Sequence, residues 1–174
     1  MMKRKDRFIV FFTAILAAAA LWVWLTPTGL SHAPDVALKT IDGRTLQLKA
    51  LRGHPVLVTF WATTCATCIK EMPHLIELYQ ELSGSGFEII GVAMYYDPPN
   101  QVLEMARELQ IPYPVALDID GSVAKRFGNV LLTPTSFLIA PDGKIVQQKI
   151  GEMDINKVRQ RILTMLESPQ KALG

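Results

Sequence analysis

The chain has 174 residues, 49% of them hydrophobic and 20% charged, which suits one domain with a real core plus an appendage and excludes a mainly disordered protein. The formal net charge of +2 comes from the N-terminus, because residues 33–174 hold 14 Lys or Arg and 15 Asp or Glu. This nearly neutral body lacks the basic surface that nucleic-acid binding requires, so we expect no nucleic-acid partner.

The N-terminus predicts a membrane segment. Residues 1–7 carry four basic side chains, and residues 8–25 form an uncharged run of 18, near the lower length limit for a helix that spans a bilayer. We expect a basic cytoplasmic end followed by a transmembrane signal-anchor helix, because positive charge stays on the cytoplasmic side. The remaining chain would then lie on the periplasmic side of the cytoplasmic membrane.

Two alternatives to this anchor stay open. A cleavable signal peptide is one, although residues 31–33 (Ser-His-Ala) make a poor small-x-small cleavage site. A buried helix of a soluble core is the other, and the basic flank argues against it. The anchor and the signal peptide both place the domain outside the cytoplasm.

The folded domain is predicted over residues 34–168. Residues 26–33, which include Pro27 and Gly29, are typical of a linker, and residues 169–174 are expected to form a C-terminal tail.

Inside the domain, strand patterns alternate with helix patterns. The predicted strands are residues 36–40, 45–48, 56–61, 87–94, 115–117, 135–139 and 145–150. The predicted helices are residues 69–82, 100–109 and 123–127, followed by a last helix that Asp154 caps. Pro73 is expected to kink the first of these helices, and Asn100 is expected to cap the second. This order indicates an α/β fold with a mixed central sheet, opened by a hairpin that turns at Asp42-Gly43.

The only two cysteines, Cys65 and Cys68, lie between the strand that ends at Trp61 and the helix that follows. A C-x-x-C pair in the first turn of a helix after a buried strand is typical of a thioredoxin-like redox site. The helix N-terminus favours a thiolate on Cys65, which we predict to be the nucleophile. Cys68 lies one turn further on the same face and is predicted to resolve the mixed disulfide.

Two alternative interpretations of the cysteine pair, a zinc site and a purely structural disulfide, are weaker. Zinc needs four ligands, and there is no second cysteine pair; the three histidines, His32, His54 and His74, are not arranged as a knuckle. A passive disulfide between cysteines three residues apart closes too small a loop to stabilise the fold much. We therefore expect no metal and no cofactor.

The stretch from Phe60 to Pro73, FWATTCATCIKEMP, resembles the membrane-anchored thioredoxin-like reductases of the TlpA/ResA type. These belong to the thioredoxin superfamily, are relatives of the AhpC/TSA redoxins, and include the oxidoreductases of cytochrome c maturation. The resemblance runs from about residue 33 to the end and includes a central αβ insertion at residues 97–127 and the stretch LTPTSFLI at 132–139. It implies a thioredoxin-like fold and thiol:disulfide oxidoreductase activity.

The resemblance also assigns roles to individual residues. Pro134 falls at the family's cis-proline, which faces the dithiol and presents the Thr133 backbone to an extended substrate; an ordinary trans proline is the alternative. Glu71 falls where the family has an acidic residue that handles the thiol proton, although a solvated helix glutamate would also fit. Pro73 matches a structural proline of the helix.

The sequence departs from the family around the first cysteine. Thr64 stands where the family often has Trp, so its contacts with a partner are open, although we include it with Trp61 among the substrate-binding candidates. The intervening Ala66-Thr67 pair leaves the reduction potential open. Tyr95 and Tyr96 end a strand and line either the substrate surface or the core rim.

By resemblance, the protein would reduce disulfides of envelope proteins, with apocytochrome c as one candidate, and would take electrons from a membrane thiol carrier. A thiol peroxidase is a second hypothesis, but Ala62 stands where that chemistry usually has Thr or Ser, three residues before the reactive cysteine. A Cu(I) chaperone is a third, since two thiolates can hold Cu(I), but no His or Met cluster lies nearby.

Overall fold

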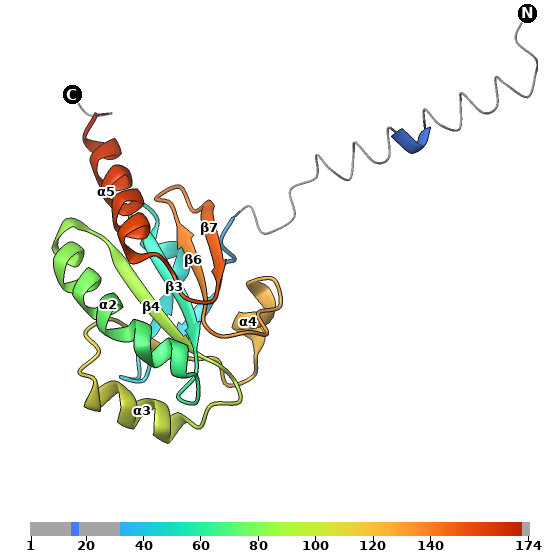
Figure 1. The fold of residues 1–174 in the computed structure, drawn as a ribbon, viewed down its shortest axis with the longest axis vertical. Helices are drawn as coiled ribbons and strands as arrows, with labels where there is room; N and C mark the ends of the chain where they lie inside the picture. The colour runs from blue at the N-terminus through green and yellow to red at the C-terminus, as the bar shows by residue number, and fades with distance from the viewer. Residues whose placement is uncertain (1–14, 18–31, 172–174) are drawn as a thin grey trace, which may run out of the picture.

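The computed structural model describes residues 15–17 and 32–171. A five-stranded mixed sheet with the order β5-β4-β3-β6-β7 forms the centre of the domain (Figure 1). The strands are β3 (Val56–Trp61), β4 (Glu88–Ala93), β5 (Val115–Leu117), β6 (Thr135–Ile139) and β7 (Ile145–Ile150). β4 runs parallel to β3 and β5, whereas β6 runs antiparallel to both β3 and β7. The predicted mixed sheet is confirmed.

The central strand β3 is buried at every position, because helices and loops cover both faces of the sheet. Leu57 and Trp61 face a core shared with α2 (Ala66–Leu82), α3 (Pro99–Glu108) and α5 (Ile155–Lys171). The alternating residues of β3, Val58 and Phe60, face the second core, as the period of two in a strand requires. The α4 helix (Ser122–Arg126) and the β1–β2 hairpin (Ala37–Lys39 and Thr45–Gln47) cover that second face.

The helix boundaries confirm one of the two predicted caps and contradict the other. The Asp154 carboxylate accepts a hydrogen bond from the Lys157 amide at 3.2 Å, as predicted. The Asn100 cap is wrong, because α3 already begins at Pro99, with Pro98 in the capping position. Proline suits the first helical position because the amide that it lacks would have no partner there. Pro73 lies inside α2, as expected.

The predicted membrane anchor falls largely outside the described residues. Only residues 15–17 of the segment 8–25 are described, and they form a helical turn. Within the described ranges, no helix is both long enough and apolar enough to cross a membrane. The predicted N-terminal segment 1–7, most of the linker 26–33 and the end of the tail also lie outside them.

Candidate active site

The two cysteines form a disulfide at the start of α2. Cys65 occupies the N-cap position in an extended conformation, and its Cα lies 5.2 Å from that of Cys68. The Cys65 sulfur accepts a hydrogen bond from the Cys68 amide at 3.2 Å. An amide at a helix N-terminus that points at a sulfur stabilises negative charge there, so the local fold favours a thiolate at Cys65 once the disulfide is reduced.

The two sulfurs differ in their access to solvent. Cys68 is 3% exposed, whereas Cys65 is partly exposed and is flanked by the exposed residues Thr64 and Ala66. A partner protein can therefore reach Cys65 but not Cys68. This asymmetry fits the predicted roles of Cys65 as the nucleophile and Cys68 as the resolving thiol.

Glu71 lies one turn after Cys68 and is buried, with 2% of its surface exposed. One carboxylate oxygen accepts a hydrogen bond from the Met153 amide at 2.6 Å. Burial raises the pKa of Glu71 above its ordinary value, and Glu152 raises it further, while the Met153 hydrogen bond and His74 oppose the rise. A buried acid whose neutral form is favoured is suited to accept a proton from a neighbouring thiol.

A small hollow of about 10 Å³ lies behind the disulfide, roughly the room that one water molecule needs. Cys68, Glu71 and Pro134 all line it together with Trp61, so the fold brings four of the predicted site residues together. The Thr133–Pro134 bond is cis, as the resemblance implies, and Pro134 is buried whereas Thr133 is partly exposed. The remaining walls come from four residues: Thr59, Met72, Leu75 and Tyr113.

Trp61 forms a wall of the site rather than part of its surface. Its side chain is 2% exposed and lies against Gly91, where an added Cβ would be 3.1 Å from the indole nitrogen. A docked substrate would therefore contact the Trp61 side chain only after a rearrangement that exposes the indole ring. Tyr95 and Tyr96 are instead 57% and 49% exposed, in an edge-to-face pair after β4.

The sequence reasoning missed Asp97. This carboxylate is 5% exposed and accepts hydrogen bonds from the Thr63 amide, at 2.7 Å, and from the Thr63 hydroxyl. It thereby fastens the loop after β4 to the loop that carries Cys65. Its position shortly after a buried strand, at the edge where the parallel strands end, was the only signal for it in the sequence.

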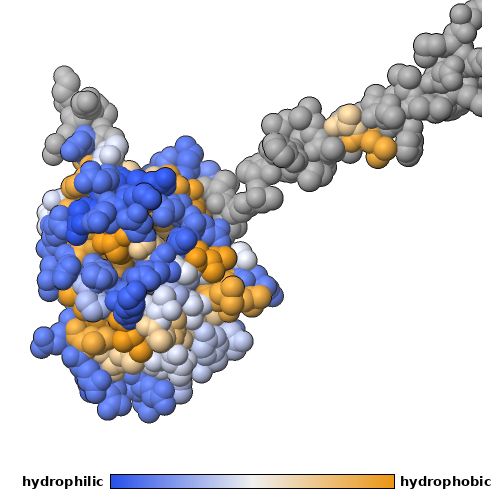
Figure 2. All heavy atoms as spheres, in the orientation of Figure 1, coloured by the Kyte–Doolittle hydropathy of each residue, from blue (hydrophilic) through white to orange (hydrophobic). Residues whose placement is uncertain are grey.

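Apolar side chains are exposed at the same end of the sheet as the disulfide. Leu131 and Leu132, just before β6, are 70% and 62% exposed, and Ile119, after β5, is 61% exposed. Figure 2 shows apolar surface beside the position that α4 has in Figure 1. Both leucines line a pocket of about 220 Å³ with Ile150. Exposed apolar patches of this kind are typical of surfaces that bind other proteins.

Groups of at least three His, Cys, Asp or Glu side chains placed to hold a metal ion do not occur in residues 15–17 and 32–171. The dithiol and the buried acid are the chemical groups that the described residues bring together at the site.

Comparisons with known proteins agree with this geometry. Residues 30–162 match the family described as Redoxin. The thiol-disulfide oxidoreductase ResA of Bacillus thuringiensis subsp. konkukian is 38% identical over 122 residues, which cover 70% of this chain and 69% of that protein. ResA of Bacillus subtilis is 33% identical over 123 residues, which cover 71% and 68% of the two chains.

Solved structures show the same fold. The thioredoxin domain of a thiol-disulfide oxidoreductase from Bacteroides vulgatus superposes with a TM-score of 0.68 and 27% identity, covering 79% of this chain and 99% of that one. StoA from Bacillus subtilis superposes with a TM-score of 0.64 and 25% identity, covering 75% and 97%. The predicted thioredoxin-like fold is confirmed.

Proposed function

Because the chain belongs to the Redoxin family and is a thiol-disulfide oxidoreductase of the TlpA/ResA type, we propose that it works as an exported, membrane-anchored reductant of protein disulfides. The observation that carries this proposal is the difference in solvent access between the two cysteines. One sulfur, on Cys65, is accessible at a helix N-terminus, while Cys68 is buried beside the carboxyl group of Glu71.

The proposed reaction proceeds in two exchanges. In the first, the Cys65 thiolate of the reduced protein attacks a substrate disulfide, forms a mixed disulfide and releases one substrate thiolate. In the second, Cys68 gives its proton to Glu71 and attacks the Cys65 sulfur. The Cys65–Cys68 bond forms, the bond from Cys65 to the substrate breaks, and the second substrate sulfur leaves with the electron pair.

Substrates of this reaction are disulfide-containing proteins. We propose that an extended segment docks against the Thr133 backbone beside cis-Pro134, with Thr64 at the rim of the contact. The exposed Leu131 and Leu132 and the tyrosine pair support a substrate with accessible apolar residues, such as an incompletely folded protein. We therefore propose envelope proteins as the substrates, with apocytochrome c as one candidate.

The proposed location follows from the N-terminal sequence. The basic residues 1–7 and the uncharged residues 8–25 support a single-pass anchor in the cytoplasmic membrane, with the catalytic domain on the periplasmic side. Outside the cytoplasm a dithiol tends to become oxidised. The cycle therefore needs a membrane thiol carrier that returns two electrons to the cysteine pair.

The reduction potential and an insulin-reduction assay test the proposed direction. A reductant should have a potential well below the roughly −120 mV of a strongly oxidising couple, and it should precipitate reduced insulin chains in the presence of dithiothreitol. A potential near that oxidising value, with slow insulin reduction, would instead indicate a protein that forms disulfides.

A further inference from the structure

Tyr113 lines two separate hollows in the described part of the chain. One is the small hollow behind Cys68, and the other is an open groove of about 590 Å³ at the β5 edge of the sheet. None of the other described residues that line the small hollow also lines the groove. Tyr113 is 4% exposed and packs edge-on against Tyr79, with ring centroids 5.9 Å apart. It thus forms the wall between the active site and the groove.

The Tyr113 hydroxyl forms no hydrogen bond with a described residue, and neither does the second carboxylate oxygen of Glu71. Among the described residues, every fully enclosed side-chain oxygen or nitrogen has a partner. These two oxygens are therefore not fully enclosed, and each has some surface open to water. Both residues line the hollow behind Cys68, where a single water molecule could bridge them.

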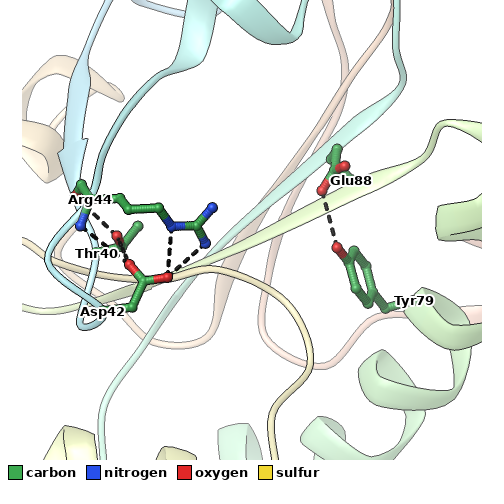
Figure 3. Close-up of polar contacts among 5 residues, drawn as sticks. All are labelled: Thr40, Asp42, Arg44, Tyr79 and Glu88. Atoms are coloured by element: carbon green, nitrogen blue, oxygen red, sulfur yellow. Dashed lines mark hydrogen bonds and ion pairs between the residues drawn. The ribbon is translucent and has the colours of Figure 1, made fainter.

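The groove on the other side of Tyr113 is polar and open. Figure 3 shows two of its walls: Arg44 and Asp42 on the hairpin, which pair at 2.6 Å, and Tyr79, which donates a hydrogen bond to Glu88 at 3.3 Å. A wide groove lined by charged side chains holds water, so a proton that reaches it exchanges with solvent.

Such an exit serves the second exchange of the proposed reaction. Glu71 accepts a proton from Cys68 in that exchange, and because its side chain is almost fully covered, the proton either returns to Cys68 or leaves through the protein. We propose that the Tyr113 hydroxyl relays this proton from Glu71 to the water of the groove. The inference rests on the role proposed for Glu71, and it makes Tyr113 a positioning residue that acts through Glu71 rather than a catalytic one.

The relay conserves every atom and charge. Protonated Glu71 gives its proton, through a bridging water, to the Tyr113 oxygen, and the proton already on that oxygen passes to water in the groove. Tyr113 ends neutral, and Glu71 ends as a carboxylate that can accept the next proton from Cys68. Burial, followed by the charge of Glu71, holds the pKa of Tyr113 far above its ordinary value, so the hydroxyl stays protonated between turnovers.

Several other titratable or charged groups face this pair from the surrounding elements. Those around Glu71 are Cys68, His74 and Glu152. Those around Tyr113 are Tyr79 and the groove residues Asp42, Arg44, Glu88 and Arg107. Since Tyr79 also lines the groove but not the small hollow, Tyr79→Phe is a matched control for Tyr113→Phe.

Single-turnover mixing of the reduced protein with a peptide disulfide tests the relay. The first phase forms the mixed disulfide at Cys65, and the second releases the remaining peptide thiol. Tyr113→Phe should leave the first phase unchanged and slow the second by about tenfold or more at neutral pH, because without the relay the proton on Glu71 returns to Cys68 before its thiolate attacks. Tyr79→Phe should leave both phases unchanged. In the unmodified protein, the second phase should be slower in deuterium oxide.

The outcomes separate the two proposals. A second phase that is unchanged in Tyr113→Phe but slow in Glu71→Gln would overturn the relay and keep the role of Glu71. A second phase unchanged in both variants would overturn both roles. The absence of a deuterium effect would overturn the relay without any substitution, and the absence of a first phase would overturn the reductase proposal together with it.

Discussion

At the scale of single residues, the site depends on groups whose surroundings change their chemistry. Glu71 is an acid in a place that disfavours its charge, because burial outweighs the one amide that bonds to it. Cys65 and Cys68 are chemically identical, yet the fold exposes one and covers the other. Both effects come from position on α2 and not from the residue type.

Glu71→Gln should slow turnover while it stabilises the fold. Since the pKa of Glu71 is raised in the folded state, folding favours its protonated form, and stability is lost as the pH rises through the folded pKa. The amide avoids this cost and can still accept the Met153 hydrogen bond. We expect a higher melting temperature than wild type at pH 8, a difference that disappears well below pH 4.5, and a lower rate of insulin reduction. A destabilised variant at pH 8 would contradict the account.

Asp97→Ala should destabilise the protein by about 1.5–3 kcal/mol, because a buried carboxylate that accepts two hydrogen bonds is lost and the Thr63 amide is left without its partner. Urea unfolding measures the change. Asp120→Ala is the matched control, since this exposed aspartate bonds only near the start of α4, and it should change stability far less than Asp97→Ala. Equal effects of the two substitutions would refute a special role for Asp97.

At the scale of elements, close contacts hold β4 against the wall of the site. An added Cβ at Gly91 would lie 3.1 Å from the indole nitrogen of Trp61 and 3.3 Å from the Tyr113 ring. These two side chains separate β4 from the hollow behind the disulfide, so a displacement of β4 would reach the active site.

Gly91→Ala should therefore cost about 1–3 kcal/mol of stability and slow disulfide reduction, because the added methyl group overpacks this wall. Gly84→Ala, where an added Cβ meets no atom within 4 Å, is the control and should be close to neutral. Chemical denaturation and the insulin assay measure the two effects. A neutral Gly91→Ala would mean that the wall is loosely packed.

The elements also show what the sequence could predict. The buried runs of β3, β4 and β6 and the apolar face of α2 depend on local pattern, and the C-x-x-C spacing identified the dithiol. The bond between Asp97 and Thr63 joins residues 34 positions apart, and Tyr113 reaches the site through tertiary packing, so neither has a local signal. The predicted Asn100 cap was wrong because α3 begins one residue earlier, at Pro99, so Asn100 already lies inside the helix.

At the scale of the whole molecule, the N-terminal segment and the domain have different compositions. The basic and uncharged residues 1–25 supply the proposed anchor, while residues 33–174 carry nearly balanced charge. The described domain has its own core on both faces of the sheet. Among the described residues that precede Trp61, Thr59 is the only one that lines the hollow behind the disulfide.

A protein that lacks residues 1–31 should therefore fold and reduce insulin at about the rate of the full chain, but it should leave the membrane fraction. Cell fractionation and the insulin assay test both parts. If the shortened protein stayed with the membrane, the anchor would have to lie elsewhere; if it failed to fold, the domain would depend on its N-terminal segment.

Trapping of mixed disulfides tests the central claim most directly, namely that exposed Cys65 attacks protein disulfides and buried Cys68 resolves them. The Cys68→Ser protein, expressed in cells with the intact N-terminus, should accumulate conjugates with envelope proteins that a reducing agent releases. The matched Cys65→Ser protein should form almost none, because Cys68 is 3% exposed. Equal trapping by both variants, or no thiol-linked partner on Cys68→Ser, would contradict the account.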